Sequence, residues 1–360
     1  MSVLQKIIIS DFRNIRFAEL EFVPGVNCIC GDNGQGKTNL LDAIYYLSMT
    51  KSAFGASDQF CTRHGCTAFS VAGSYRMDDG LVSRFVISVG DNGKTLKRDD
   101  KSFPRISAHI GTLPIVMVSP QDSSLVSESG EERRRFVNAV LSQMDAQYLA
   151  ALQRYNRLLA QRNKLLKESY PDDYLLDAIE QQMAPAAQYI SEKRAAFAVE
   201  LEKAVAVYYS QLSGGGETVS ISYRSDCDGD YLNVFRRSRA KDMVLKYTSA
   251  GIQRDDFIFD MDGHPIRKCG SQGQQKSFLV ALKLAQYDIM KRAYGFPPIL
   301  LLDDVFDKLD VHRISNLLKI VSNNDYGQIF ISDTNRERME SIISDIAPDT
   351  AFFNARNGEF

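Results

Sequence analysis

The segment Gly31-Asp32-Asn33-Gly34-Gln35-Gly36-Lys37-Thr38 constrains the fold of this chain more than any other, because it matches the pattern G-x-x-x-x-G-K-[ST]. Glycines let successive backbone N–H groups turn inward and hold phosphate oxygens without clashes from Cβ atoms. Residues 26–30 before the loop predict a strand, and residues 38–48 after it have apolar side chains at helical spacing. The pattern therefore predicts a phosphate-binding strand–loop–helix unit in an α/β fold. A purely structural glycine-rich turn is the alternative.

Two side chains of this loop have expected roles with a nucleotide. Lys37 is predicted to reach the β- and γ-phosphates, and the hydroxyl of Thr38 is predicted to ligate Mg²⁺. The helix that follows adds the positive end of its dipole to the same site. The expected cofactors are therefore ATP and Mg²⁺.

The most apolar strand expected in the chain ends in two carboxylates. Residues 299–302 are Ile-Leu-Leu-Leu, which is typical of a central strand buried on both faces, and Asp303 and Asp304 follow. Ligands bind beyond the carboxyl ends of the strands in open α/β sheets. Asp303 is predicted to hold Mg²⁺, and Asp304 to polarise the attacking water. A solvated strand end with two ordinary acids is the alternative.

A second loop also precedes a predicted helix, of residues 276–292. Its sequence is Gly270-Ser271-Gln272-Gly273-Gln274-Gln275-Lys276. Ser271 can cap the helix while Gly273 exposes backbone N–H groups, which predicts a second anion site. The nucleotide-binding residues expected here are Ser271, Gln272, Gly273 and Gln274. A well-capped helix with no ligand is the alternative.

The pattern between these loops predicts an inserted lobe. Residues 68–90 alternate in character and, with the turn 91–93, predict antiparallel strands, so the sheets are expected to be mixed. Residues 131–208 are polar and favour helices, with a break near residues 170–171. We therefore expect an ATPase head formed by residues 1–122 and 291–360, and a mainly helical lobe formed by residues 123–290.

The order of these motifs resembles that of ABC/SMC-type P-loop ATPase heads. By this resemblance Gln121 corresponds to the catalytic glutamine of the Q-loop, and Leu309-Asp310 to the D-loop. In such heads the signature loop of one subunit, here residues 271–274, covers the ATP on another. The resemblance therefore implies a two-fold dimer with two ATP molecules between the subunits.

A finer resemblance is to the RecF family, and it extends from residue 3 to the end of the sequence. By this resemblance Arg13 and Asn14 lie beside the adenine and ribose, and residues 332–334 lie where transporter heads have a switch histidine. The family usually has Gly-Pro-His-Arg-Asp-Asp where this chain has Ile252 and Gln253 after the glycine. The stretches that carry the resemblance are 11–14, 31–38, 133–136, 161–166, 251–256, 271–276 and 301–310.

The RecF resemblance implies a function in recombinational repair and replication-fork maintenance. An ATP-driven homodimer would clamp DNA that is duplex, gapped or branched, and would help to load RecA with RecO and RecR, supporting the SOS response. Slow, DNA-dependent ATP hydrolysis would act as the switch. The alternatives are an ABC ATPase module of a transport or translation system, and a scaffold with a degenerate site.

The net charge of −2 gives no overall attraction to DNA, so any contact must come from local patches. Residues 231–246 contain five basic residues and one acid, and residues 133–135 are three arginines. Either cluster is a candidate for phosphate contacts, although a solvated face is the commoner role of such a run. The six cysteines and four histidines show no metal-site spacing. Neither a signal peptide nor a membrane span is evident, so a cytoplasmic location is expected.

Overall fold

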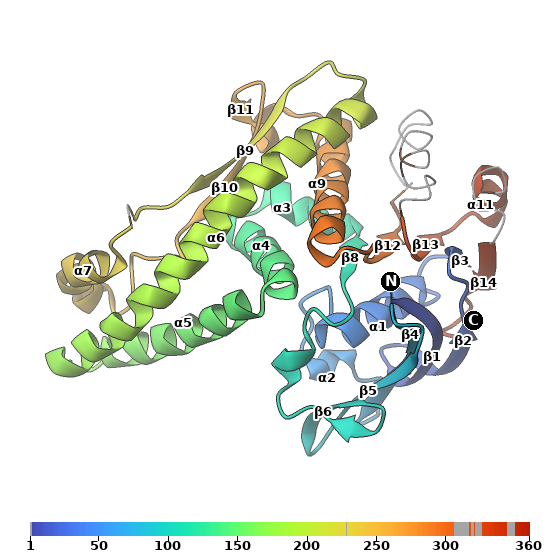
Figure 1. Ribbon diagram of the computed structural model, residues 1–360, viewed down its shortest axis with the longest axis horizontal. Coiled ribbons are helices and arrows are strands. Elements are labelled where there is room, and N and C mark those ends of the chain that lie inside the picture. Colours follow the sequence, from blue (N-terminus) through green and yellow to red (C-terminus); the bar gives the residue numbers. More distant parts are fainter. Residues whose placement is uncertain (1, 228, 306–316, 318–319, 321–325, 344–349) are drawn as a thin grey trace.

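The computed structural model describes residues 2–227, 229–305, 317, 320, 326–343 and 350–360. The described strands form three sheets, and a long helical arm extends from the part of the molecule that contains both chain ends (Figure 1). The α/β head with mixed sheets and a mainly helical lobe, which the sequence predicts, is confirmed. Leu309 and Asp310 lie outside the described residues.

The central sheet has five parallel strands in the order β14-β3-β13-β12-β8. Successive residues of its strands enter two different cores: Ile299 and Leu301 of β12 face one, Leu300 and Leu302 the other. This arrangement explains why the strands are apolar on both faces. Their bounds are β3 Val26–Cys30, β8 Ile115–Val118, β12 Ile299–Asp303, β13 Ile329–Asp333 and β14 Thr350–Asn354.

An antiparallel sheet of six strands, β2-β1-β4-β5-β6-β7, covers one side of the head. Helix α1, Lys37–Met49, packs between this sheet and the central sheet and contributes apolar residues to the core that they share. The predicted hairpin is present, since Gly90 pairs with Gly93. The strands are β1 Val3–Phe12, β2 Ile15–Glu21, β4 Phe69–Arg76, β5 Val82–Gly90, β6 Gly93–Arg98 and β7 Lys101–Ser102.

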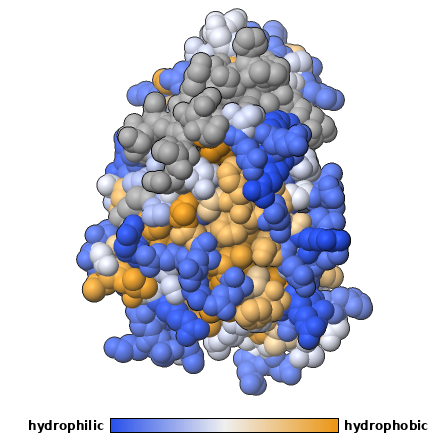
Figure 2. All heavy atoms as spheres, turned by 90° about the vertical axis from the view of Figure 1, so that its right-hand side faces the viewer, coloured by the Kyte–Doolittle hydropathy of each residue, from blue (hydrophilic) through white to orange (hydrophobic). Residues whose placement is uncertain are grey.

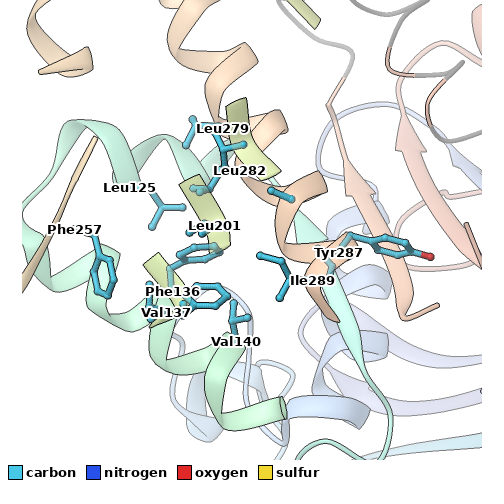
Figure 3. Packing of buried hydrophobic residues seen from close by; sticks show 14 of the residues in the cluster. Leu125, Phe136, Val137, Val140, Leu201, Phe257, Leu279, Leu282, Tyr287 and Ile289 are labelled. Atoms are coloured by element: carbon cyan, nitrogen blue, oxygen red, sulfur yellow. The ribbon is translucent and has the colours of Figure 1, made fainter. Parts of the chain in front are cut away.

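The helical lobe packs on the other face of the central sheet. Figure 3 shows side chains of α3, α4, α6, β10 and α9 meeting in one apolar cluster. Its longer helices are α4 Gly130–Met144, α5 Ala146–Leu165, α6 Asp173–Ser213, α7 Tyr231–Leu245 and α9 Gln272–Tyr294. Its three-stranded sheet contains β9 Val219–Arg224, β10 Asp256–Met261 and β11 His264–Pro265.

Short helices connect these elements. They are α2 Asp58–Cys61, η1 Ile106–His109, η2 Pro120–Ser123, α3 Ser124–Ser127, α8 Ile266–Cys269 and α11 Arg336–Ile343. In the described part of the chain, none of the helices combines the length and apolar character that crossing a bilayer requires. On the side that carries α11 and β14, an apolar area occupies the middle of the surface, with hydrophilic residues beside and below it (Figure 2).

Two predicted helix boundaries differ from the structure. Helix α9 begins at Gln272, four residues before the predicted start, because Ser271 closes a capping box there and the following glycine is part of the first turn. Residues 131–208, for which the sequence predicts one main break, also contain a second one: α4 and α5 are separated at Asp145. The predicted break near residues 170–171 is confirmed, since those residues lie between α5 and α6.

Candidate functional site

The P-loop, residues 31–38, connects β3 to α1 at the carboxyl end of the central sheet. Gly31, Gly34 and Gly36 all have positive φ, of 154°, 81° and 110°. A Cβ on Gly36 would lie 3.0 Å from Oδ1 of Asn14, so a larger residue would have to displace that side chain and adopt a strained backbone. Asp32, Asn33 and Gly34 are exposed at the tip of the loop, while Gln35 is half-buried. The sequence therefore forms the open glycine-rich cradle that a phosphate requires.

Lys37 is buried in the cradle, with 4% of its surface exposed. Its Nζ donates hydrogen bonds to the carbonyls of Gly31, at 2.7 Å, and Asp32, at 3.0 Å. The ammonium group is therefore held over the loop by neutral acceptors. Because no acidic side chain in the described residues forms an ion pair with it, its charge is available to an anion in the cradle.

Thr38 of α1 and Asp303 at the end of β12 meet at the carboxyl end of the central sheet. The Thr38 hydroxyl donates to both carboxylate oxygens of Asp303, at 2.9 and 3.0 Å. Ser332 at the end of β13 donates to Oδ1 of Asp303 at 2.7 Å. Burial raises the pKa of Asp303, and the hydrogen bonds from Ser332 and Thr38 oppose this. Hydroxyl and carboxylate oxygens are the hard ligands that Mg²⁺ prefers, so these residues fit the predicted metal.

Asp304 lies beside the start of α9. Its backbone has a φ of 46°, and its N–H donates to Oγ of Ser332 at 3.0 Å. A pocket of about 250 Å³ is lined by Asp304 together with Gln272, Lys276 and residues of η2. Gln121, also in η2, is exposed and lines a neighbouring pocket. The structure thus places the second acid, the predicted Q-loop and the start of the signature helix close together.

The signature loop shows the capping role that the sequence left open as an alternative. Oγ of Ser271 accepts from the N–H of Gln274 at 3.3 Å, and Oε1 of Gln274 accepts from the N–H of Ser271 at 2.7 Å. Nε2 of Gln274 donates to Glu217 at 2.6 Å, so both ends of that amide are engaged. Ser271 and Gln272 are exposed, and Gly273 is half-buried in the first turn. No hydrogen bond or ion pair between described residues joins this loop to residues 31–38.

Arg13 and Asn14 have different surroundings. The Arg13 guanidinium is paired with the buried Asp42, with Nη2 2.6 Å from Oδ2, and also donates to Ser52. Asn14 is exposed, and its Oδ1 accepts from Asn39 of α1 at 2.7 Å. Asn14 therefore lies directly against the P-loop, whereas the Arg13 side chain is already satisfied by the head.

Two components of the site were missed by the sequence interpretation. The sequence places Ser332 only where transporter heads have a switch histidine. In the structure its hydroxyl donates a hydrogen bond to Asp303. Residues 355–360 had no assigned role, yet the N–H of Gly358 donates to the carbonyl of Gln35 at 2.8 Å. The hydroxyl at a strand end was a usable signal for Ser332. Nothing local to residues 355–360 indicates this contact, because it depends on the pairing of β14 with β3.

Comparison with known proteins identifies the family. Residues 3–59 match the family described as RecF/RecN/SMC N terminal domain. The DNA replication and repair protein RecF of Phocaeicola vulgatus is 42% identical over 361 residues, covering 99% of this chain and 97% of that protein. The protein of the same name from Porphyromonas gingivalis is also 42% identical, with 99% of each chain covered. The chain belongs to the RecF family.

Solved structures agree with this assignment. The chain matches the structures of the recombination mediator protein RecF-ATP, with a TM-score of 0.89 and 28% identity, and RecF-ATPrS, with 0.88 and 29%. Both matches cover 99% of this chain, and 96% and 97% of those chains. An Smc head domain from Pyrococcus furiosus matches with a TM-score of 0.57 at 15% identity, which shows a shared fold alone. These relatives favour the RecF interpretation over a transport or translation module.

Ile252 and Gln253, which replace the usual Pro-His pair of RecF sequences, lie in the helical lobe. Oε1 of Gln253 accepts from the Tyr155 hydroxyl at 2.5 Å, and its Nε2 donates to the carbonyl of Ala250 at 2.8 Å. The Ile252 carbonyl accepts from Arg194 at 2.7 Å. In this RecF chain the two residues are therefore hydrogen-bonded within the lobe, next to the retained Arg-Asp-Asp sequence.

Proposed function

We propose that this chain is an ATP-dependent DNA-binding protein of recombinational repair and replication-fork maintenance. ATP joins the P-loop of one subunit to the signature loop of another, and the closed homodimer clamps duplex, gapped or branched DNA. Slow ATP hydrolysis reopens it. RecR and RecO are the partners in RecA loading that membership of the RecF family suggests, and the SOS response is the process it supports.

One observation carries this proposal. The P-loop is complete at one place in the head, whereas Ser271 and Gln272 are exposed at another, without a contact between them in the described residues. Two anion-binding elements that make no direct contact within one molecule are the arrangement expected if they hold the same triphosphate from two molecules of a two-fold dimer. The apolar area beside β14 and α11 supports contact with another protein surface on that side (Figure 2).

The roles proposed for individual residues follow from the geometry. The backbone of residues 31–36 and Lys37 would hold the phosphates, and Thr38 and Asp303 would hold Mg²⁺, which neutralises phosphate charge when bound. Asp304 and Gln121 would orient the attacking water, and Asn14 would lie beside the nucleoside, next to Arg13. Residues 271–274 would close the site from the second subunit.

We also propose the division into a head, residues 1–122 and 291–360, and a lobe, residues 123–290. One apolar cluster includes Val116 and Leu300 of the head together with Leu282 of α9, so the two parts share a core. A rigid connection of this kind would transmit a change at the nucleotide to the arm. The location we propose is the cytoplasm, where ATP, DNA and the partners are present.

Sedimentation velocity with and without ATP and duplex DNA tests the proposal. Wild-type protein should sediment as a dimer only with ATP, and DNA binding should require the same nucleotide. Ser271→Arg should block dimerisation while ATP binding to the monomer persists, because the added side chain fills the contact. Ser129→Arg is the matched control: Ser129 is also an exposed N-cap residue and makes no side-chain cap bond. A nucleotide-independent monomer, or dimerisation of Ser271→Arg, would contradict the proposal.

A further inference from the structure

The segment that follows β14, residues 355–360, is attached to the P-loop by backbone hydrogen bonds. The N–H of Ala355 donates to the carbonyl of Cys30 at 2.7 Å, just before the loop. The N–H of Gly358 donates to the carbonyl of Gln35 at 2.8 Å, and the N–H of Asn357 donates to Oε1 of the same residue at 2.6 Å. The segment is therefore fixed near both ends of the loop.

The two segments also pack backbone against backbone. A Cβ on Gly31 would lie 2.4 Å from the carbonyl oxygen of Ala355, and a Cβ on Gly358 would lie 2.5 Å from the carbonyl oxygen of Asn14. A Cβ on Gly36 would approach Cα of Gly358 to 3.3 Å. Approaches this close leave no room for side chains at Gly31 and Gly358. Because Gly31 and Gly36 belong to the loop, a displacement of the segment at these contacts alters the packing of the loop.

The bond to Gln35 sets the direction of the next N–H. In a planar trans peptide unit the C=O and N–H groups point in opposite directions. Because Gly358 holds the carbonyl of Gln35 toward the segment, the N–H of Gly36 in the same peptide unit points away from it. In a glycine-rich cradle, N–H groups that point inward are the ones that bind phosphate oxygens.

We propose that residues 355–360 are a positioning element of the nucleotide site, which orients the peptide unit between Gln35 and Gly36 for a phosphate group. This inference rests on the proposed function, in which the P-loop holds ATP. A loop with three glycines has access to many backbone conformations, and restricting it before binding removes an entropic cost from the binding step. ATP affinity therefore depends on a segment more than three hundred residues away in sequence.

A pair of glycine substitutions tests this inference with a matched backbone strain. Gly358 and Gly80 both have a φ of 81°, but a Cβ on Gly80 has nothing within 4 Å, whereas one on Gly358 meets the Asn14 carbonyl. Gly358→Ala should weaken ATP binding by about tenfold, the effect of losing part of one hydrogen bond to a charged group. Gly80→Ala should bind ATP as the wild type does. Isothermal titration calorimetry of the chain of residues 1–360 measures both.

A second variant covers the outcome in which Gly358→Ala does not fold. Gln35→Met removes the acceptor for the Asn357 N–H and keeps a side chain of similar length, and it should weaken ATP binding in the same direction. Thermal unfolding without nucleotide separates positioning from stability: a merely structural segment would lower the melting temperature and leave the ATP affinity of the folded protein unchanged. Wild-type affinity in folded Gly358→Ala or Gln35→Met would overturn the inference. Failure of the wild type to bind ATP would instead contradict the proposed function.

Discussion

Charged side chains are arranged differently in the helical lobe and at the nucleotide site. In the lobe, Arg162 is fully buried between Glu180 and Asp242, with nitrogen–oxygen distances of 2.9 and 2.7 Å. Arg194 is similarly enclosed and paired with Asp255 at 2.8 Å. At the site, Lys37 is also buried, but its hydrogen bonds go to neutral carbonyls. The lobe pairs these two buried arginines with its own acids, whereas Lys37 has no acidic partner among the described residues.

This difference predicts different consequences of mutation. Removing one member of a buried pair leaves an uncompensated charge and destabilises the fold. Removing a charge that is reserved for a ligand affects binding and turnover, because the folded protein without ligand does not depend on an opposite charge there. Stability and activity should therefore separate between the two regions.

The largest effect is expected for Lys37→Arg. ATP hydrolysis should fall by about 100-fold or more, because the bulkier guanidinium cannot place its charge where Nζ of Lys37 lies, and misplacing one group that stabilises developing charge typically costs this much. The melting temperature without nucleotide should stay close to the wild-type value. A phosphate-release assay and thermal unfolding measure the two quantities, with Lys203→Arg on the exposed side of α6 as the control. Wild-type hydrolysis in Lys37→Arg would remove the role assigned to this lysine.

The reverse pattern is expected for Arg162→Met. The substitution leaves Glu180 and Asp242 buried with fewer partners, which should lower the free energy of unfolding by about 3 kcal/mol. ATP affinity of the folded protein should not change. Arg236→Met is the control, because Arg236 forms an exposed pair with Asp177, and exposed ion pairs contribute little to stability. Urea unfolding measures both variants. Equal losses in the free energy of unfolding would contradict the expected difference between buried and exposed ion pairs.

A buried imidazole in the head should produce a smaller, pH-dependent effect. Burial lowers the pKa of His109, whose Nε2 lies 2.6 Å from the Leu47 carbonyl. As the pH falls, the imidazole of His109 is therefore protonated at a higher pH in the unfolded chain than in the folded chain. The neutral, buried imidazole of His109 makes its full contribution to the free energy of unfolding above about pH 6.5. This contribution is lost as the pH falls below that value. Thermal unfolding from pH 8 to pH 5 measures this loss, which His109→Gln should reduce; an identical pH profile in that variant would exclude the role of His109.

Periodicity and motif spacing predicted the elements of the site better than their contacts. The strand–loop–helix unit at residues 26–49 and the apolar strand before Asp303 follow from local pattern alone. The pairing of Arg13 with Asp42, and the packing of Gly358 against Asn14, join residues distant in sequence, and no local signal encodes them. Sequence also could not show which charges in a basic run are free, because this depends on the helices that pack beside it.

In the basic run on α7, packing against neighbouring helices changes which residues we expect to contact DNA phosphates. Arg236 and Arg239 pair with acids of α6, and Arg239 reaches Glu180 at 2.5 Å, so both side chains already have partners within the lobe. Arg133 is likewise paired with Asp256 at 2.9 Å. Arg237 and Lys241 are exposed and make no ion pair among the described residues. Any phosphate contact from α7 should therefore come from these two.

The expected change in the salt dependence of DNA binding is correspondingly small. Arg237→Ala should reduce the log–log slope of affinity against salt by about 0.9 if the side chain meets one phosphate of a duplex. Arg239→Ala should leave that slope unchanged and lower stability instead, because its partner is Glu180. Fluorescence anisotropy with duplex DNA and ATP at several salt concentrations measures the slopes. If Arg239→Ala changed the slope more than Arg237→Ala, α7 would exchange its internal ion pairs for phosphate contacts when DNA binds. The separation between structural and ligand-binding charges would then not apply to this helix.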